Sequence, residues 1–467
     1  MTVRAHLVPA AATAALLAAV LVPPATAAQS PQSGRGAASV VGVDVVAEVG
    51  PLGAAVTAVA IELDRTVSAP YTDLDEAAFA VQATLDDVTA PRTVTDVYLS
   101  DSAQPGEPRT RGRVVVVELS ADDPNAGVLW YDGTLNHRYA LEGAYLVEVL
   151  DDVVDRRGRV LVRETGDALA NDDVVIPVVD DFAVRATTGS SGVLLRYGLY
   201  SPGRDRSPGS HHGHPSGGRP GEGPDGTLYP LVVALHGSGE RGTDGTTQLL
   251  ANELGVAFAK PSRQASDPSF VLVPQAPPPS VQPVEPGQSV WEVPGVQQAL
   301  LELVDRAIAT YPVDPDRVYL TGLSMGSMGT FDILPKRPEL FAAALPVTGY
   351  ADLASAPVLK DIPIWATHSV DDTTVLYDRP DSDWNLMAAI EATGTPVTRD
   401  EWAANLPDEE NEANARAQWE RAEAEGSHTL FTTWSAGTTP VNPHFAWVPT
   451  YSNDVMVDWL YSHVRGE

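Results

Sequence analysis

The pattern of hydrophobic and polar positions first predicts a β-rich region, from Val40 to about Asp180. Its short valine-rich runs, several of which alternate apolar with polar residues, are separated by turns, which is typical of half-buried strands. The predicted strands are VVGVDVVAEV, AAVTAVAIEL, FAVQATL, TVTDVYLS, RVVVVELS, AYLVEVL and RVLVRE. About seven strands in roughly 140 residues, without an amphipathic helix between them, favour an antiparallel β-sandwich of immunoglobulin type. We assign residues 40–181 to this domain and see no cluster of catalytic residue types in it.

The pattern changes after Asp181. The segment FAVRATTGSSGVLLRYGLYSP predicts two more strands, and residues 203–226 are then almost free of apolar side chains. We interpret residues 203–226 as a disordered loop insertion. It contains His211, His212 and His214, but no carboxylate or rigid scaffold accompanies them, so we expect neither a metal site nor a cofactor.

From Leu228 onward, strands alternate with helices, which indicates an α/β domain over residues 182–467. The continuous apolar runs YPLVVALHG and SFVLVPQAP are typical of buried parallel strands. Residues 294–311 form an amphipathic pattern and predict a helix, and VYLTG, AALPVTG and IPIWATHS follow as strands. The predicted fold class is therefore α/β, preceded by an all-β sandwich.

A candidate nucleophile lies in the stretch YLTGLSMGSMGTF, residues 319–331. It contains the only G-x-S-x-G of the chain, formed by Gly322, Ser324 and Gly326. A strand is predicted before Ser324 and a helix from Met325 to Leu334, so the serine falls at a strand-to-helix corner. The small residues on both sides allow the tight turn that exposes a nucleophilic hydroxyl.

A serine nucleophile needs a base, and the required chain order leaves His428, His444 and His463. We favour His444, because it lies in an irregular segment where loops at the carboxyl edge of the sheet converge. His428 begins a predicted strand, and His463 lies in the amphipathic C-terminal helix VMVDWLYSH.

The acid that orients the base is predicted at the end of the strand IPIWATHS, where Asp371 and Asp372 are adjacent. We favour Asp372, because the turn D-x-x-V that follows returns Val375 to the core, and Asp371 stays the alternative.

The oxyanion hole is predicted from two backbone N–H groups, those of Met325 and Ser238, with Gly239 as the alternative to Ser238. We expect Glu240 and Arg241 to pair and hold this loop.

Composition restricts the compartment and the partners. Acidic residues outnumber basic ones 62 to 30, a net charge of −32, which argues against nucleic acid or an anionic membrane as partner. The chain has no cysteine, which excludes disulfides and thiolate chemistry. Arg4, an apolar run over residues 10–22 and the sequence Ala25-Thr-Ala27 predict a signal peptide over residues 1–28, cleaved near Ala27 or Ala28. We therefore expect a secreted protein without a membrane span in the mature chain, of undetermined oligomeric state.

At this point the chain resembles a known family, the secreted α/β-hydrolase esterases with an N-terminal immunoglobulin-like domain, related to the polyhydroxybutyrate depolymerase-like esterases and the predicted peptidases. The similar segments are PLVVALHGSGERG, FVLVPQAP, DPDRVYLTGLSMGSMGTFD, PELFAAALPVTG and HFAWVPTYSNDVMVDWLYS. The resemblance implies an α/β-hydrolase fold with Ser324 as nucleophile and His444 as base, and it is less specific for the substrate. Ser327 and Ser369 depart from the glycines that many relatives have there.

These observations favour a serine carboxylesterase that acts through an acyl-enzyme on a small-molecule or polymeric ester. Two alternatives stay open, a serine peptidase on the same triad and a polymer-binding or surface-binding protein with a degenerate hydrolase domain. Residues 398–426 include an acidic run that predicts a helix. We favour a solvated surface helix with Trp419 docked on the core. The alternative hypothesis is a cap over the active site in which Trp402 or Trp419 limits the length of the acyl chain.

Overall fold

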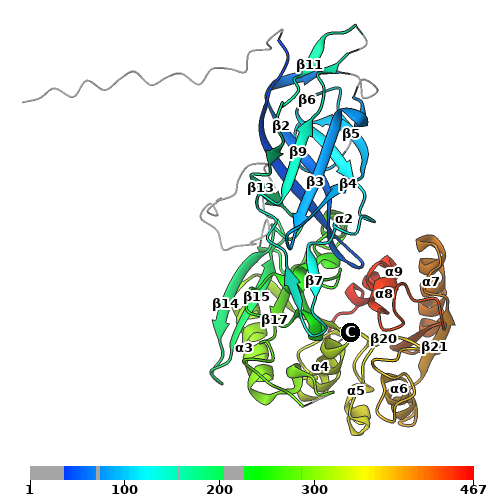
Figure 1. Cartoon of the computed structure of the whole chain (residues 1–467). Coiled ribbons are helices and arrows are strands. Elements are labelled where there is room, and N and C mark those ends of the chain that lie inside the picture. The colour runs from blue at the N-terminus through cyan, green and yellow to red at the C-terminus, as the bar shows by residue number, and fades with distance from the viewer. Residues whose placement is uncertain are drawn as a thin grey trace, which may run out of the picture.

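The computed structural model describes residues 36–69, 74–106, 108–155, 157–203, 226–285 and 287–466. Figure 1 shows a strand-rich part, coloured blue to cyan, above an α/β part, coloured green to red. The predicted signal peptide and residues 204–225, including the three clustered histidines, lie outside the described residues. Among the helices of the described residues, none is long and apolar enough to cross a membrane.

The N-terminal part is a β-sandwich of a five-stranded sheet, in the order β13-β1-β2-β6-β5, and a four-stranded sheet, in the order β12-β9-β3-β4. Alternate valines such as Val59 and Val115 point inward and are fully buried, as the period of a strand requires. The strands are β1 (Val40–Gly50), β2 (Gly53–Ser68), β3 (Phe79–Leu85), β4 (Val88–Arg92), β5 (Val94–Ser100), β6 (Arg111–Leu119), β7 (Leu129–Tyr131), β8 (Asn136–Arg138), β9 (Tyr145–Val149), β10 (Val153–Val154), β11 (Val160–Val162), β12 (Leu169–Ala170) and β13 (Asp173–Val175). The seven predicted strands are confirmed, and the sequence analysis missed the shorter ones, among them the hairpin β7–β8.

The C-terminal part is built on a nine-stranded sheet in the order β14-β15-β17-β16-β18-β19-β20-β22-β21. The strands β14 and β15 pair antiparallel, and β15 pairs antiparallel with β17. All later pairs in this order, from β17–β16 to β22–β21, are parallel. The strands are β14 (Ala183–Thr188), β15 (Leu194–Tyr200), β16 (Tyr229–Leu235), β17 (Phe270–Gln275), β18 (Val313–Leu323), β19 (Ala343–Val347), β20 (Ile364–Ser369), β21 (Val397–Trp402) and β22 (Thr429–Trp434). This mixed, largely parallel sheet agrees with the predicted α/β class.

Helices cover both faces of this sheet, because successive residues of its strands point to opposite sides. Tyr319 of β18 belongs to the hydrophobic cluster under α1, α7, α8 and α9, whereas Leu320 belongs to the cluster under α3, α4, α5 and α6. The helices are α1 (Thr247–Leu250), α2 (Pro261–Ser266), α3 (Pro294–Thr310), α4 (Met325–Ile333), α5 (Ala356–Leu359), α6 (Asp383–Glu391), α7 (Asp408–Glu425), α8 (Trp447–Tyr451) and α9 (Asp454–Tyr461). The helices predicted over residues 294–311 and 325–334 are confirmed as α3 and α4.

The segment of residues 398–426 is a crossover rather than a cap. It forms the edge strand β21 and the helix α7, which returns the chain to β22 in parallel with β21. The Trp402 side chain is buried, and its indole N–H donates to Asn411 Oδ1 over 2.8 Å. Trp419 packs against the same hydrophobic cluster. The hypothesis of an acyl-pocket cap is therefore wrong, because both indoles serve the packing of α7 on the sheet.

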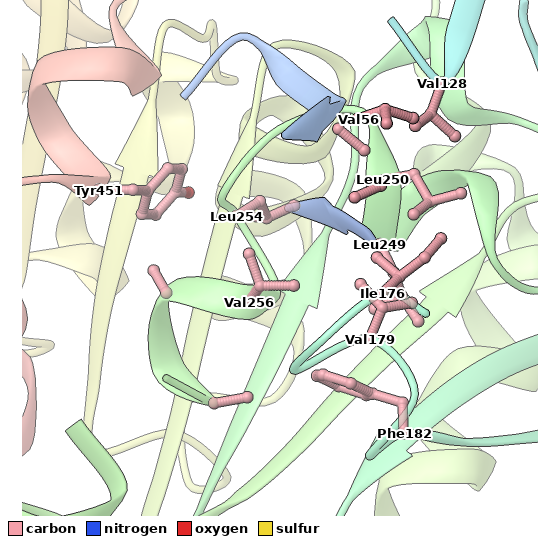
Figure 2. Packing of buried hydrophobic residues seen from close by; sticks show 14 of the residues in the cluster. Val56, Val128, Ile176, Val179, Phe182, Leu249, Leu250, Leu254, Val256 and Tyr451 are labelled. Carbon is pink, nitrogen blue, oxygen red and sulfur yellow. The ribbon is translucent and has the colours of Figure 1, made fainter. Parts of the chain in front are cut away.

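The two parts share one hydrophobic core. Val56 and Val128 of the sandwich belong to the same buried cluster as Leu249 and Leu250 of α1 (Figure 2). The turn between β1 and β2 also touches α1, since a Cβ atom at Gly53 would lie only 3.1 Å from the carbonyl oxygen of Ala251. The sandwich is thus packed against the α/β part and not merely tethered to it.

Candidate active site

Ser324 occupies a strained corner between β18 and α4. Its backbone has φ 52° and ψ −118°, a combination that residues other than glycine rarely adopt. The close packing around it demands glycine, because a Cβ at Gly326 would lie 1.8 Å from the Leu235 carbonyl oxygen. A Cβ at Gly322 would lie 2.4 Å from the Gly326 carbonyl oxygen. The corner therefore has the geometry of a nucleophile elbow.

The side chains of Ser324, His444 and Asp372 form one hydrogen-bonded chain. Ser324 Oγ lies 2.9 Å from His444 Nε2, and His444 Nδ1 lies 2.7 Å from Asp372 Oδ2. Because a carboxylate only accepts, Nδ1 carries the proton, and Nε2 of the neutral ring is left to accept the serine proton. The three residues follow the carboxyl ends of β18, β22 and β20, so the parallel sheet brings them to one edge.

The alternatives considered for the base and the acid lie elsewhere. Asp371 Oδ2 accepts the N–H of Gly437 over 2.8 Å instead of contacting His444. His428 Nε2 contacts the carbonyl of Lys360, and His463, just after the end of α9, contacts the Trp459 carbonyl through Nδ1. Of the predicted candidates, the structure brings together only the set favoured from the sequence.

The predicted oxyanion loop passes beside the nucleophile. It follows β16 and forms a short 3-10 turn, Ser238–Glu240. A Cβ at Gly237 would lie 3.6 Å from Cβ of Ser324, so this loop borders the serine. Met325 is the first residue of α4, and the N–H groups of a first helical turn have no partner within the helix. Ser238 and Met325 therefore present backbone N–H groups on elements that flank Ser324.

The expected pair of Glu240 and Arg241 does not form. Arg241 turns outward from the loop, with Nε donating to the Pro277 carbonyl over 2.8 Å and the guanidinium also bonded to the Gln282 carbonyl. Glu240 Oε1 instead accepts from the side chain of Asn136, on β8 of the sandwich. Burial raises the pKa of Glu240 to about 7. The prediction failed because each side chain finds a partner elsewhere in the fold. Glu240 binds Asn136, and Arg241 binds the carbonyls of Pro277 and Gln282.

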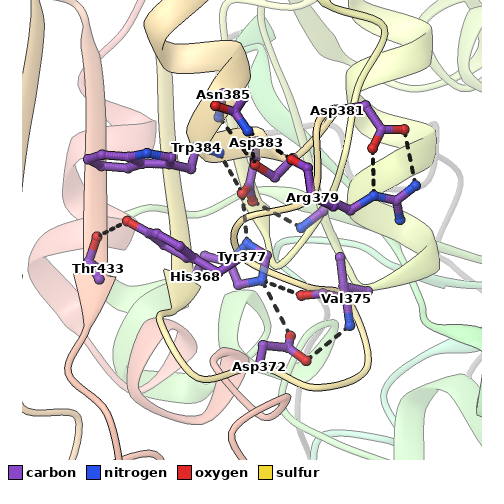
Figure 3. Close-up of polar contacts among 12 residues, drawn as sticks. His368, Asp372, Val375, Tyr377, Arg379, Asp381, Asp383, Trp384, Asn385 and Thr433 are labelled. Atoms are coloured by element: carbon purple, nitrogen blue, oxygen red, sulfur yellow. Dashed lines mark hydrogen bonds and ion pairs between the residues drawn. The ribbon is translucent and has the colours of Figure 1, made fainter.

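A second histidine, His368 at the end of β20, lies directly behind the triad acid (Figure 3). Its Nδ1 lies 2.7 Å from Asp383 Oδ1, and its Nε2 lies 2.9 Å from the Val375 carbonyl oxygen and 3.4 Å from Asp372 Oδ2. All these atoms are acceptors, so both ring nitrogens must donate and the buried ring is an imidazolium. The sequence analysis treated His368 as part of a strand, although a histidine in a buried strand before two aspartates was a usable signal.

Comparisons with known proteins place both parts of the chain. The model of the esterase Ig-like N-terminal domain matches residues 42–162, and that of the prolyl oligopeptidase family matches residues 295–381. A solved structure described as a thermostable esterase is 29% identical with a TM-score of 0.71, over 91% of this chain and 100% of that one. The chain therefore combines an immunoglobulin-like N-terminal domain of the kind found in esterases with an α/β-hydrolase domain.

Two curated relatives match this chain over shorter stretches. A bifunctional acetylxylan esterase/xylanase of Neocallimastix patriciarum is 28% identical over 95 residues, which are 20% of this chain and 14% of the relative. Poly(3-hydroxyalkanoate) depolymerase C of Paucimonas lemoignei is 30% identical over 123 residues, which are 26% of this chain and 28% of the relative. The chain thus spans less than a third of the length of either of these two curated relatives.

Opposite charges stabilise the Asp372 side of the candidate site. Burial alone would lower the pKa of His368, but the charges and hydrogen bonds of Asp383 and Asp372 outweigh it and raise that pKa to about 10. Burial alone would raise the pKa of Asp372, but hydrogen bonds from His368 and His444 hold it far below its usual range. The two backbone N–H groups of Thr374 and Val375 also donate to Asp372 Oδ1. The triad acid is therefore ionised and fixed in place.

Replacement of His368 should change how stability depends on pH. A histidine in the unfolded chain has a pKa of about 6.5, whereas the pKa of His368 in the folded wild type is about 10. The folded state therefore binds this proton more tightly than the unfolded state does. Its stabilising contribution is complete below pH 6.5 and is lost as the pH rises toward about 10. We expect His368→Gln to be less stable than the wild type at pH 7 and to lose less unfolding free energy between pH 7 and 10. Urea denaturation at each pH measures both curves, and parallel curves would contradict the imidazolium assignment.

Proposed function

We propose that this protein cleaves carboxylic esters through an acyl-enzyme formed on Ser324. The observation that carries the proposal is the continuous chain from Ser324 Oγ through His444 to Asp372, which begins at a strained nucleophile corner. A hydroxyl is a poor nucleophile until a base accepts its proton, and this geometry aims Nε2 of a correctly oriented imidazole at that proton.

The reaction follows from these positions. Ser324 Oγ attacks the ester carbonyl carbon while its proton passes to His444 Nε2, and the oxyanion that forms accepts from the N–H groups of Met325 and Ser238. The carbon–alcohol bond then breaks, and His444 returns the proton to the departing alcohol oxygen. A water molecule, deprotonated by His444, attacks the acyl-enzyme and releases the carboxylic acid and free serine. Asp372 stays ionised throughout and stabilises the imidazolium.

The surroundings of the triad favour an ester with an apolar group. Val370 and Leu376 flank the acid loop, Val441 precedes His444, and all three side chains are exposed. The Trp447 ring meets the His444 ring edge-on, with centroids 5.2 Å apart, and the Phe445 ring lies tilted against Trp447. The printed names of the two curated relatives, which refer to acetylxylan and poly(3-hydroxyalkanoate), both refer to carboxylic esters. We therefore propose a short acyl ester, either small or part of a polymer, as the substrate.

A peptidase is the second candidate, and the match to the prolyl oligopeptidase family over residues 295–381 favours it. That stretch includes Ser324 and Asp372, and the same triad can protonate an amine. Rates on nitrophenyl esters of rising acyl length, beside peptide nitroanilides, decide between them. Faster turnover of the peptides would overturn the esterase proposal. The third reading, a binding protein with a degenerate hydrolase domain, is disfavoured by the intact hydrogen-bonded chain at Ser324.

Replacement of the nucleophile should abolish turnover. Ser324→Ala removes the atom that forms the acyl-enzyme, so kcat on nitrophenyl acetate should fall by about 10⁶-fold, as in other serine hydrolases. A fluorophosphonate probe should label the wild type and not the variant. Turnover by the variant above about 1% of the wild type, after repurification, would exclude Ser324 as the nucleophile.

The two adjacent aspartates give a matched pair of isosteric variants. Asp372→Asn should lower kcat by about 10⁴-fold, because an amide next to Nδ1 favours the wrong histidine tautomer. Asp371→Asn should change kcat little, since the amide oxygen can still accept the Gly437 N–H. Steady-state rates on one ester compare the two, and equal losses would mean that the acid has been misassigned.

We also propose that the protein is exported, on the basis of its N-terminal sequence pattern alone. The expected outcome is a mature chain in the culture medium that begins within a residue or two of Ala28. Intact-mass measurement of the secreted protein tests this, and a full-length chain retained in the cells would refute it.

A further inference from the structure

The hairpin β7–β8 connects the sandwich to the active site. Figure 1 shows β7 extending from the sandwich down to the α/β part. The side-chain amide of Asn136, on β8, donates to Glu240 Oε1 over 3.2 Å, across 104 residues of sequence. Glu240 ends the 3-10 turn that begins at Ser238, whose N–H is a proposed oxyanion donor. A residue of the sandwich therefore contacts the oxyanion loop directly.

The hairpin also packs against the backbone of this loop. A Cβ at Gly239 would lie 2.9 Å from Asn136 Nδ2 and 3.5 Å from Cε2 of Tyr131. A side chain at this position would displace the Asn136 amide, so Gly239 permits the close approach of the hairpin. The loop is thus confined on one side by Asn136 and Tyr131, and its preceding residue Gly237 borders Ser324 on the other.

Asn136 is the only side-chain donor to Glu240 among the described residues, and the backbone N–H groups of Gly237 and Glu240 also favour its carboxylate. Its side chain is buried, and Oε2 has no hydrogen-bond partner among the described residues. The nearby His236 does not supply a charge, although its Nδ1 lies 3.8 Å from Oε2. The Ala276 N–H donates to His236 Nε2, so the ring is neutral and Nδ1–H donates to the Gly237 carbonyl. Loss of the Asn136 amide would leave a buried carboxyl group without its side-chain donor.

The hairpin has its own internal support. Asp132 Oδ1 accepts the N–H groups of Thr134 and Leu135, which closes the turn. His137 Nε2 lies 2.9 Å from Asp132 Oδ2, and the His137 ring stacks on Trp130. None of these contacts involves the side chain of Asn136. The hairpin should therefore stay folded when Asn136 is truncated.

We propose that Asn136 is a positioning residue for the oxyanion hole, through which the docked sandwich holds the Ser238 N–H beside Ser324. The inference rests on the proposed function, because the oxyanion hole matters only if Ser324 forms an acyl-enzyme. It assigns the sandwich a part in catalysis: its hairpin forms one wall of the active site and fixes one of the two donors. Glu240 and Gly239 transmit the contact.

The test is Asn136→Ala in the full chain, assayed on nitrophenyl acetate. A misplaced oxyanion donor weakens the binding of the transition state more than the binding of the ester. We therefore expect kcat to fall about tenfold or more while KM changes less than twofold. The inhibition constant of an alkylboronic acid, which forms a tetrahedral adduct with serine, should rise in the same proportion as kcat falls. Arg138→Ala, an exposed position on the same strand, is the matched control and should leave both values unchanged.

A double variant provides the rescue. Asn136→Asp combined with Glu240→Gln exchanges donor and acceptor, so that the amide at 240 donates to the carboxylate at 136 across the same contact. We expect it to recover most of the kcat and boronate affinity lost in Asn136→Ala. Wild-type values in Asn136→Ala, or equal losses of kcat in Asn136→Ala and the double variant, would overturn the inference. Failure of the proposed function is distinguishable, because the wild type itself would then show neither ester turnover nor labelling of Ser324.

Discussion

The close contact between the start of α4 and the end of β16 is the constraint on which the active site depends. This contact holds Ser324 in a backbone conformation that costs about 1–3 kcal/mol. The conformation persists because Gly326 packs directly against the Leu235 carbonyl. The N–H of Ser324 is also fixed, by the carbonyl of Val347 on β19. One contact thus exposes the serine hydroxyl and brings the loop after β16 beside it. The nucleophile and the oxyanion loop are consequences of the same packing.

A second constraint is electrostatic. Asp372 and Asp383 are both buried, and two carboxylates without a counter-charge would be expelled or protonated. His368 lies between them and donates to acceptors from both nitrogens. The backbone N–H groups of Gly349 and Trp384 also donate to Asp383. The triad acid is therefore part of a closed polar network, which fixes its orientation without the help of solvent.

The sandwich contacts the α/β part in two ways, through an apolar interface and through a hydrogen bond. Val56 and Val128 bury apolar surface against α1, which fixes the sandwich relative to the sheet. The hairpin β7–β8 then reaches the oxyanion loop at Asn136. The apolar contact is non-directional and supplies docking energy, whereas the amide contact is directional and selects a position. A strand-rich domain without catalytic residue types thus contacts the loop beside Ser324.

The sequence by itself determined the seven main strands of the sandwich, the helices α3 and α4, and the alternation of strands and helices, because periodicity and the turn residues are local signals. It also indicated Ser324, Asp372 and His444, since the carboxyl ends of parallel strands meet at one edge. Only the tertiary structure decided the contacts of Glu240, the charge on His368 and the burial of Trp402. Each of these depends on which group the folded chain places against a buried polar atom, whether 9, 15 or 104 residues away. No local pattern of residues encodes that competition.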